Sequence, residues 1–142
     1  MTRDRISFRI TAPVALLCSS LLAVPPWGRA EEQKRRNDEP MDVVLARVPE
    51  KARGKANPYQ NDAEAVLGGK KLFEQHCAEC HGATGGGGNR GPSLLPDEKI
   101  HATPGETFWI LTNGVVRRGM PSWSKLPEQQ RWQIVAFLSS LK

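Results

Sequence analysis

Apolar residues recur at helical spacing in three stretches of the chain, and polar or glycine-rich segments separate the three. The first stretch follows Asp62, a suitable N-cap residue, and carries an apolar stripe from Ala65 to Phe73. The last stretch starts at Pro127, and its apolar positions cover a broad face up to Leu141. No segment alternates apolar and polar residues for long, so the pattern predicts an all-α domain of three or more helices.

The middle stretch has the strongest start signal. Thr103 suits the N-cap, Pro104 suits the first helical position, and Glu106 completes a capping box. We expect this helix to end at Asn113-Gly114 with a residue in the left-handed conformation. In the first stretch, Gly69 costs the helix up to about 1 kcal/mol relative to alanine. A glycine at such a position indicates close approach by another backbone.

The N-terminal 30 residues have the pattern of a secretory signal peptide. An arginine-containing start precedes the apolar run Ile10–Val24, which is about 15 residues long against the ~20 that span a membrane. Gly28-Arg29-Ala30 then offers a cleavage site, with Glu31 as the first mature residue. We therefore expect export to the periplasm, and an uncleaved anchor is the alternative.

Residues 31–60 form a charged leader that Pro40, Pro49 and Pro58 interrupt. Two interpretations weigh evenly: a flexible leader without function, or an arm that lies across the domain or contacts a partner. The remaining residues, 61–142, are predicted to be the functional domain.

Charge gives no indication of a nucleic-acid partner. The 142-residue chain has 20 Lys and Arg against 15 Asp and Glu, a net charge of +5. Removing residues 1–30 leaves 16 basic and 14 acidic residues, a net charge of only +2.

The candidate chemistry lies in Cys77-Ala78-Glu79-Cys80-His81. This Cys-x-x-Cys-His pattern is typical of c-type haem attachment, in which the two thiols form thioethers with one haem and the imidazole binds the iron. A zinc site would normally need a second ligand pair, a redox dithiol would sit near a βαβ pattern, and a structural disulfide would leave His81 unexplained. The motif predicts one covalently attached haem c, with Cys77 and Cys80 as its attachment sites and His81 as an iron ligand.

Met120 is the candidate for the opposite face of the iron. It follows Gly119, which allows close backbone approach, and precedes Pro121, which stiffens the loop. Its rival is His101, and a core-filling role is the plainer interpretation of any methionine. Histidine and methionine together raise the reduction potential and leave no open iron position, which favours electron transfer over enzymatic chemistry.

Three motifs in order resemble the class I, mono-haem bacterial cytochromes c: Cys77–His81, then Gly91-Pro92-Ser93-Leu94, then Gly119-Met120-Pro121-Ser122-Trp123. The resemblance covers about residues 62–142. It implies a soluble periplasmic protein with three to five helices wrapped around the haem.

The resemblance also implies roles for single residues. His81 would be the proximal ligand and Met120 the distal one, and the Pro92 carbonyl would accept a hydrogen bond from His81. Gly69 and Phe73 on the first helix would cross Ile134 and Phe137 on the last. Candidates for contact with the haem propionates are, first, Trp123 and Arg90, and then Trp109, Arg117 and Arg118.

These expectations describe an electron carrier and not an enzyme. Its donor would be a periplasmic dehydrogenase, and the stretch Gly105–Ile110 is similar to small cytochromes that accompany quinoprotein or other dehydrogenases. Its acceptor would be an oxidase or a reductase. The alternatives are a haem-containing subunit of a dehydrogenase complex, and an open-iron peroxidase or gas-binding protein.

Overall fold

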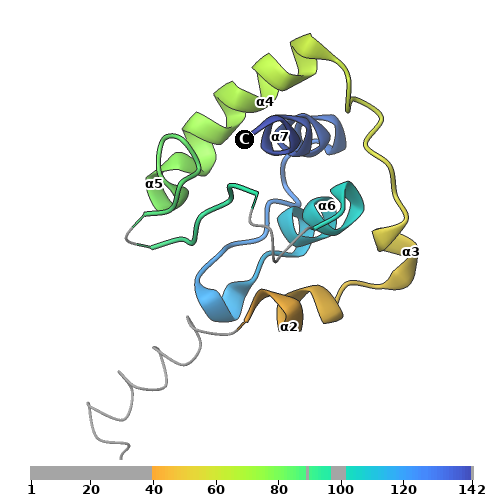
Figure 1. Ribbon diagram of the computed structural model, residues 1–142, viewed down its shortest axis with the longest axis vertical. Helices are drawn as coiled ribbons and strands as arrows, with labels where there is room; N and C mark the ends of the chain where they lie inside the picture. Colours follow the sequence, from red (N-terminus) through yellow and green to blue (C-terminus); the bar gives the residue numbers. More distant parts are fainter. Residues whose placement is uncertain (1–39, 89, 97–101, 142) are drawn as a thin grey trace, which may run out of the picture.

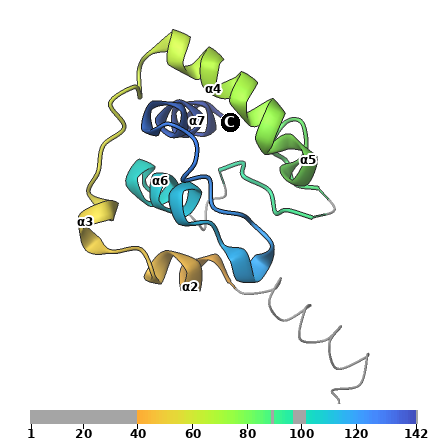
Figure 2. The same cartoon turned by 180° about the vertical axis from the view of Figure 1, so that it is seen from behind.

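The helix between Glu128 and Ser140, α7, lies between two other helices, and the rest of the chain is arranged around it (Figures 1 and 2). The structure is a computed structural model that describes residues 40–88, 90–96 and 102–141. Within these ranges the chain forms helices and a single isolated β-bridge, which confirms the all-α prediction. The helices are α2 (Met41–Ala46), α3 (Glu50–Arg53), α4 (Ala63–His76), α5 (Ala78–His81), α6 (Pro104–Asn113), the 3-10 helix η1 (Val116–Arg118) and α7 (Glu128–Ser140).

The predicted signal peptide, residues 1–30, lies outside the described residues. Among the helices that are described, none has the length and apolar character needed to span a membrane.

The local start signals of α4 and α6 act as the sequence predicts. Asp62 Oδ1 accepts hydrogen bonds from the amides of Glu64 (2.9 Å) and Ala65 (3.1 Å). At α6, Glu106 N donates to Thr103 Oγ1 (3.2 Å) and Thr103 N donates to Glu106 Oε2 (2.7 Å), which completes the capping box. The end of α6 differs from the prediction: Gly114 has φ +71° but ψ 176°, outside the left-handed helical region, because the chain there turns to meet Pro121.

The helices α4 and α7 cross where Gly69 meets Gln133. A Cβ atom at Gly69 would overlap the backbone carbonyl of Gln133, so only glycine permits this approach. Beside the crossing, the rings of Phe73 and Phe137 lie 5.2 Å apart, and Phe73 is completely buried. The predicted crossing of the first and last helices of the domain is confirmed.

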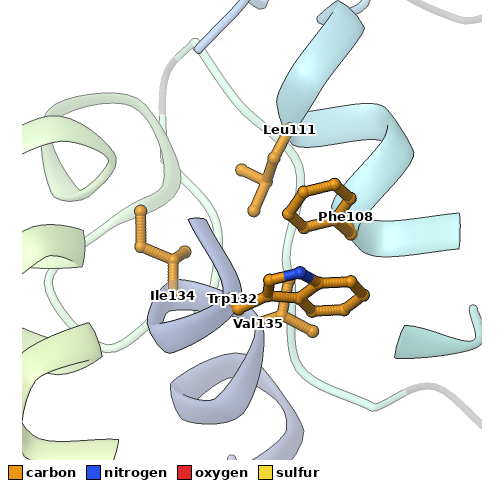
Figure 3. Close-up of a cluster of buried hydrophobic side chains, with 5 residues drawn as sticks. All are labelled: Phe108, Leu111, Trp132, Ile134 and Val135. Carbon is orange, nitrogen blue, oxygen red and sulfur yellow. The ribbon is translucent and has the colours of Figure 1, made fainter. Parts of the chain in front are cut away.

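The other side of α7 packs on α6 (Figure 3). Trp132 stacks on Phe108 with 4.0 Å between ring centroids and 15° between ring planes. Leu111 and Val135 complete this part of the core, and both are buried. Burial of such side chains contributes roughly 1.5–3 kcal/mol each, so α7 binds α4 on one side and α6 on the other.

The described part of the predicted leader, residues 40–60, packs on the domain. Val44 and Val48 are buried, and α3 contacts α6. Asn57 is also buried, and its Nδ2 donates a 3.0 Å hydrogen bond to the carbonyl of Trp132 in α7. Between the two interpretations of this segment, these contacts favour an arm that lies across the domain.

The crossing at Gly69 yields a prediction for stability. We expect Gly69→Ala to lower the free energy of unfolding by about 2 kcal/mol, since overpacking costs about 3 kcal/mol and alanine returns about 1 kcal/mol of helix propensity. Chemical denaturation of the haem-loaded protein, followed by circular dichroism, measures the change.

The neighbouring Gly68 provides a matched control. A Cβ there would lie 3.4 Å from the flexible side chain of Gln133, an ordinary contact, so Gly68→Ala should be neutral or stabilising by up to about 1 kcal/mol. Equal stability of the two variants would show that α4 and α7 do not meet at Gly69.

Candidate haem site

The two cysteines lie on a tight turn that continues α4. Cys77 is the C-cap residue of α4 and the N-cap residue of α5, and its amide donates to the Phe73 carbonyl (2.8 Å). The amide of His81 in turn donates to the Cys77 carbonyl (3.0 Å). Residues three and four apart share one face of a helical turn. Cys77, Cys80 and His81 are therefore held close together by local backbone bonds.

Both thiols are free, and Cys77 is buried. Burial, followed by the nearby Cys80 thiol, raises the pKa of Cys77 from 9.0 to about 11. Redox dithiols depend on a cysteine with a lowered pKa, because the thiolate is the attacking species. The environment of Cys77 therefore opposes the redox-dithiol interpretation. A neutral thiol still carries the S–H that adds across a vinyl group to form a thioether.

Among the residues that the structure describes, no group of three or more His, Cys, Asp and Glu side chains is arranged to hold a metal ion. The zinc interpretation thus gains no second ligand pair in that part of the chain.

His81 is oriented by the segment that follows the glycine-rich loop. Its Nδ1 lies 2.8 Å from the carbonyl oxygen of Pro92. A carbonyl can only accept, so Nδ1 carries the proton and the lone pair of Nε2 is left for a metal. Gly91 makes room for this contact, because a Cβ there would lie 2.9 Å from His81 Nδ1.

The glycine-rich loop is bonded to the same turn. Gly87 N donates to the His81 carbonyl (2.8 Å), and Leu94 N donates to the Gly85 carbonyl (2.7 Å). Gly82, Gly85 and Gly87 all have positive φ angles, which glycine adopts without steric cost. The loop therefore folds back on His81 and carries Pro92 to it.

Arg90, one of the candidates for the haem propionates, forms an ion pair with Glu79. Its hydrogen bond to the Glu79 carboxylate raises the pKa of the Arg90 guanidinium, and both side chains are exposed. Surface pairs of this kind contribute little free energy, so the pair leaves Arg90 able to exchange Glu79 for another carboxylate.

Met120 lies in a loop that is closed by the isolated β-bridge. Val115 N donates to the Met120 carbonyl (3.0 Å), and Met120 N donates to the Val115 carbonyl (3.2 Å). Gly119 completes the turn with a φ of +85°. The side chain of Met120 is half-buried and packs against the core cluster that contains Phe108 and Trp132. The backbone amide and carbonyl of Met120 are thus held in place.

Trp123, the other first-choice propionate candidate, connects the two halves of the site. Its amide donates to the Leu111 carbonyl (2.9 Å), and its ring lies 5.1 Å from that of His76, centroid to centroid. His76 precedes Cys77, so the Met120 loop contacts the end of α4. His76 was not predicted to take part in the site; its position directly before the first cysteine was the available signal.

The remaining candidates have other surroundings or are not described. Trp109 and Arg117 line a pocket of about 180 Å³ together with Val44 of α2. Arg118 is half-buried in η1. His101, the rival of Met120, lies outside the described residues.

Figures 1 and 2 both show α5 and the turn that contains η1 at the same edge of the molecule, with the chain after α5 between them. The turn that contains α5 carries two thiols and an imidazole with a free Nε2, and the loop after η1 carries the thioether of Met120. Imidazole and thioether are ligands that haem iron takes in cytochromes c, and the tight packing of Gly91 against His81 keeps the ring in the orientation that leaves Nε2 free. The residues present fit a covalently held haem.

Comparison with known proteins agrees with this chemistry. The family model described as "Cytochrome C oxidase, cbb3-type, subunit III" matches residues 64–138. Comparisons with curated proteins and with solved structures gave no match. The matched region begins at the start of α4 and ends within α7, so it includes both halves of the site and excludes α2 and α3.

The contact of His81 with Gly91 and Pro92 yields a prediction. We expect Gly91→Ala to disturb the hydrogen bond between His81 Nδ1 and the Pro92 carbonyl, because the added Cβ would meet His81 Nδ1 at 2.9 Å and the Cys80 carbonyl oxygen at 3.0 Å. Loss of this bond makes the imidazole less basic and the ferric state less stable. The reduction potential should rise by about 30–60 mV, where 59 mV corresponds to a tenfold change for one electron. Potentiometric titration measures the shift.

Gly86→Ala is the control, because a Cβ there would make only an ordinary contact at 3.4 Å with Thr84. An unchanged potential in Gly91→Ala would show that the Pro92 contact does not tune the ligand.

Proposed function

Since the chain belongs to the family of cbb3-type cytochrome c oxidase subunit III domains and carries covalently attached haem c, we propose that it transfers single electrons between redox proteins as a class I-type cytochrome c. The observation that carries this proposal is the hydrogen bond from His81 Nδ1 to the Pro92 carbonyl, which leaves Nε2 for the iron. Met120, the second ligand in this proposal, lies in the loop after η1, where its backbone is paired with Val115.

In this proposal each residue of the site has one task. Cys77 and Cys80 hold the haem through thioethers, and His81 binds the iron through Nε2. Met120 binds the opposite face through sulfur. Trp123 and Arg90 are assigned to the haem propionates, Trp123 from its place in the Met120 loop and Arg90 by exchanging its exposed partner Glu79. Haem c supplies a one-electron iron couple, and methionine as an axial ligand raises its potential.

Two protein ligands leave the iron without an open coordination position. This supports a carrier over an open-iron peroxidase or gas-binding protein, in which a substrate must reach the metal. His81 and Met120 are both anchored through backbone atoms, and such anchoring favours ligands that stay in place through each redox cycle.

We assign the protein to the periplasm because residues 1–30 have the pattern of a secretory signal peptide. A periplasmic dehydrogenase, a quinoprotein among the candidates, would be the donor. An oxidase or a reductase would be the acceptor.

A haem subunit of a larger oxidoreductase is the second candidate function. The observation that favours it is the description of the matching family, which names a subunit of an oxidase. The same site would then pass electrons within an assembly rather than between separate proteins.

The axial ligand yields a prediction. In Met120→Ala the iron loses its sulfur ligand, so the weak sulfur-to-ferric-iron absorption band should disappear. The reduced protein should then bind carbon monoxide promptly, and the potential should fall, because methionine ligation raises it. Absorption spectra of the oxidised and reduced protein, recorded before and after carbon monoxide is added, measure the band and the binding of carbon monoxide. A redox titration measures the potential.

Met41→Ala is the matched control, since Met41 is also half-buried but lies in α2. It should keep the band and remain closed to carbon monoxide. If the wild-type spectrum lacks the band and Met120→Ala leaves the spectrum unchanged, the assignment of Met120 is wrong. The iron is then either open or bound by His101.

Fractionation of cells that express the full chain tests location and role together. We expect the haem-stained protein in the periplasmic fraction, with Glu31 as its first residue by mass spectrometry and with the native size of a single chain. Recovery from the membrane with residues 1–30 intact would contradict cleavage. Recovery in a larger complex would favour the second candidate function over a free carrier.

A further inference from the structure

Arg53 connects three helices through its side chain. Its guanidinium donates to the Glu106 carboxylate in α6 (2.9 Å), and also to the carbonyls of Leu45 (2.7 Å) and Val48 (3.1 Å) at the end of α2. Arg53 itself is the last residue of α3. The Glu106 side chain is only 6% exposed and the Arg53 side chain 33% exposed, so the carboxylate of this partly buried pair is screened less by water than that of a surface pair.

The backbone of Arg53 adds to the same junction. Its carbonyl accepts a 3.0 Å hydrogen bond from Thr103 Oγ1 at the start of α6. At Gly105, the second residue of α6, a Cβ would overlap the carbonyl of Ala52 in α3. The backbone of residues 40–60 therefore packs directly against the backbone of the first turn of α6.

The other end of α6 holds the loop of Met120. Ser122 Oγ donates to the Thr112 carbonyl (2.6 Å) and Trp123 N donates to the Leu111 carbonyl (2.9 Å). A Cβ at Gly114 would lie 2.6 Å from the Pro121 carbonyl carbon. Any shift of α6 relative to α7 thus carries the Met120 loop with it.

Helix α2 also faces this loop across a pocket. Val44 of α2 and Arg47, its C-cap residue, line this pocket together with Val115 and Val116. Val115 is the residue whose two backbone hydrogen bonds hold Met120. One segment outside the family match, residues 40–60, therefore contacts the start of α6 and lines a pocket with the residues just before Met120.

We infer that residues 40–60 position the Met120 loop, and that Arg53 is the positioning residue through which α2 and α3 are held on α6. This inference rests on the proposed function, in which Met120 is an iron ligand. Without the Arg53 contacts the loop populates an open state more often, and an added ligand that needs this open state binds with higher apparent affinity.

Imidazole binding to the ferric holoprotein tests the inference, because imidazole must displace Met120 to reach the iron. We expect Arg53→Ala to bind imidazole about tenfold more tightly than wild type, within the 5–150-fold range of typical coupling between sites. Hydrogen–deuterium exchange of the peptide that spans residues 112–123 gives a readout independent of the haem iron, and it should become faster. Lys51→Ala is the matched control on the same helix, where Lys51 is exposed, and it should match wild type in both measurements.

Arg53→Lys guards against a simple loss of folding. It keeps a cation beside Glu106 but lacks the fork that reaches three acceptors, so we expect about threefold tighter imidazole binding with an unchanged circular dichroism spectrum. The inference would be overturned if both Arg53 variants had the same imidazole affinity and the same exchange rate as Lys51→Ala. Failure of the proposed function gives a different result, because the wild type then lacks the sulfur-to-iron absorption band. Faster hydrogen exchange of residues 112–123 in Arg53→Ala would still support the positioning role of Arg53.

Discussion

The approach of α4 to α7 at Gly69 is the constraint on which the other contacts depend. With the two backbones this close, Phe73 and Phe137 meet on one side of α7, and Trp132 is left to stack on Phe108 of α6 on the other. Because α4 ends at the cysteine motif and α6 ends at the Met120 loop, α7 sets the distance between the two halves of the site. A side chain in place of the hydrogen at Gly69 would shift both halves relative to each other.

Each iron ligand of the proposed site is oriented by main-chain atoms. His81 Nδ1 meets the carbonyl of Pro92, and Met120 is paired with Val115 through two amide–carbonyl bonds. A backbone partner remains present when its own side chain is changed, so only substitutions that shift the backbone should break these bonds. Trp123, which packs against the core, and His76 also join the halves through a ring contact.

Residues 40–60 add to the matched family domain a part that its model, residues 64–138, does not contain. The segment brings a buried asparagine to α7 and an arginine to the buried carboxylate of Glu106. Buried charges are costly unless paired, so these contacts commit the segment to one place on the domain. A chain that only needed a spacer before its haem domain would have no use for them.

Local chemistry in the sequence determined the helix starts and the identity of the reactive residues. The Asp62 cap and the Thr103 capping box depend on neighbours two or three residues away, and so does the Cys-x-x-Cys-His motif. Only the tertiary structure decided that Arg53 meets Glu106, that Asn57 meets Trp132 and that Arg90 pairs with Glu79. The conformation of Gly114 was also decided by a distant contact, with Pro121. Such pairs follow from how the helices pack, and neither periodicity nor spacing along the chain contains that information.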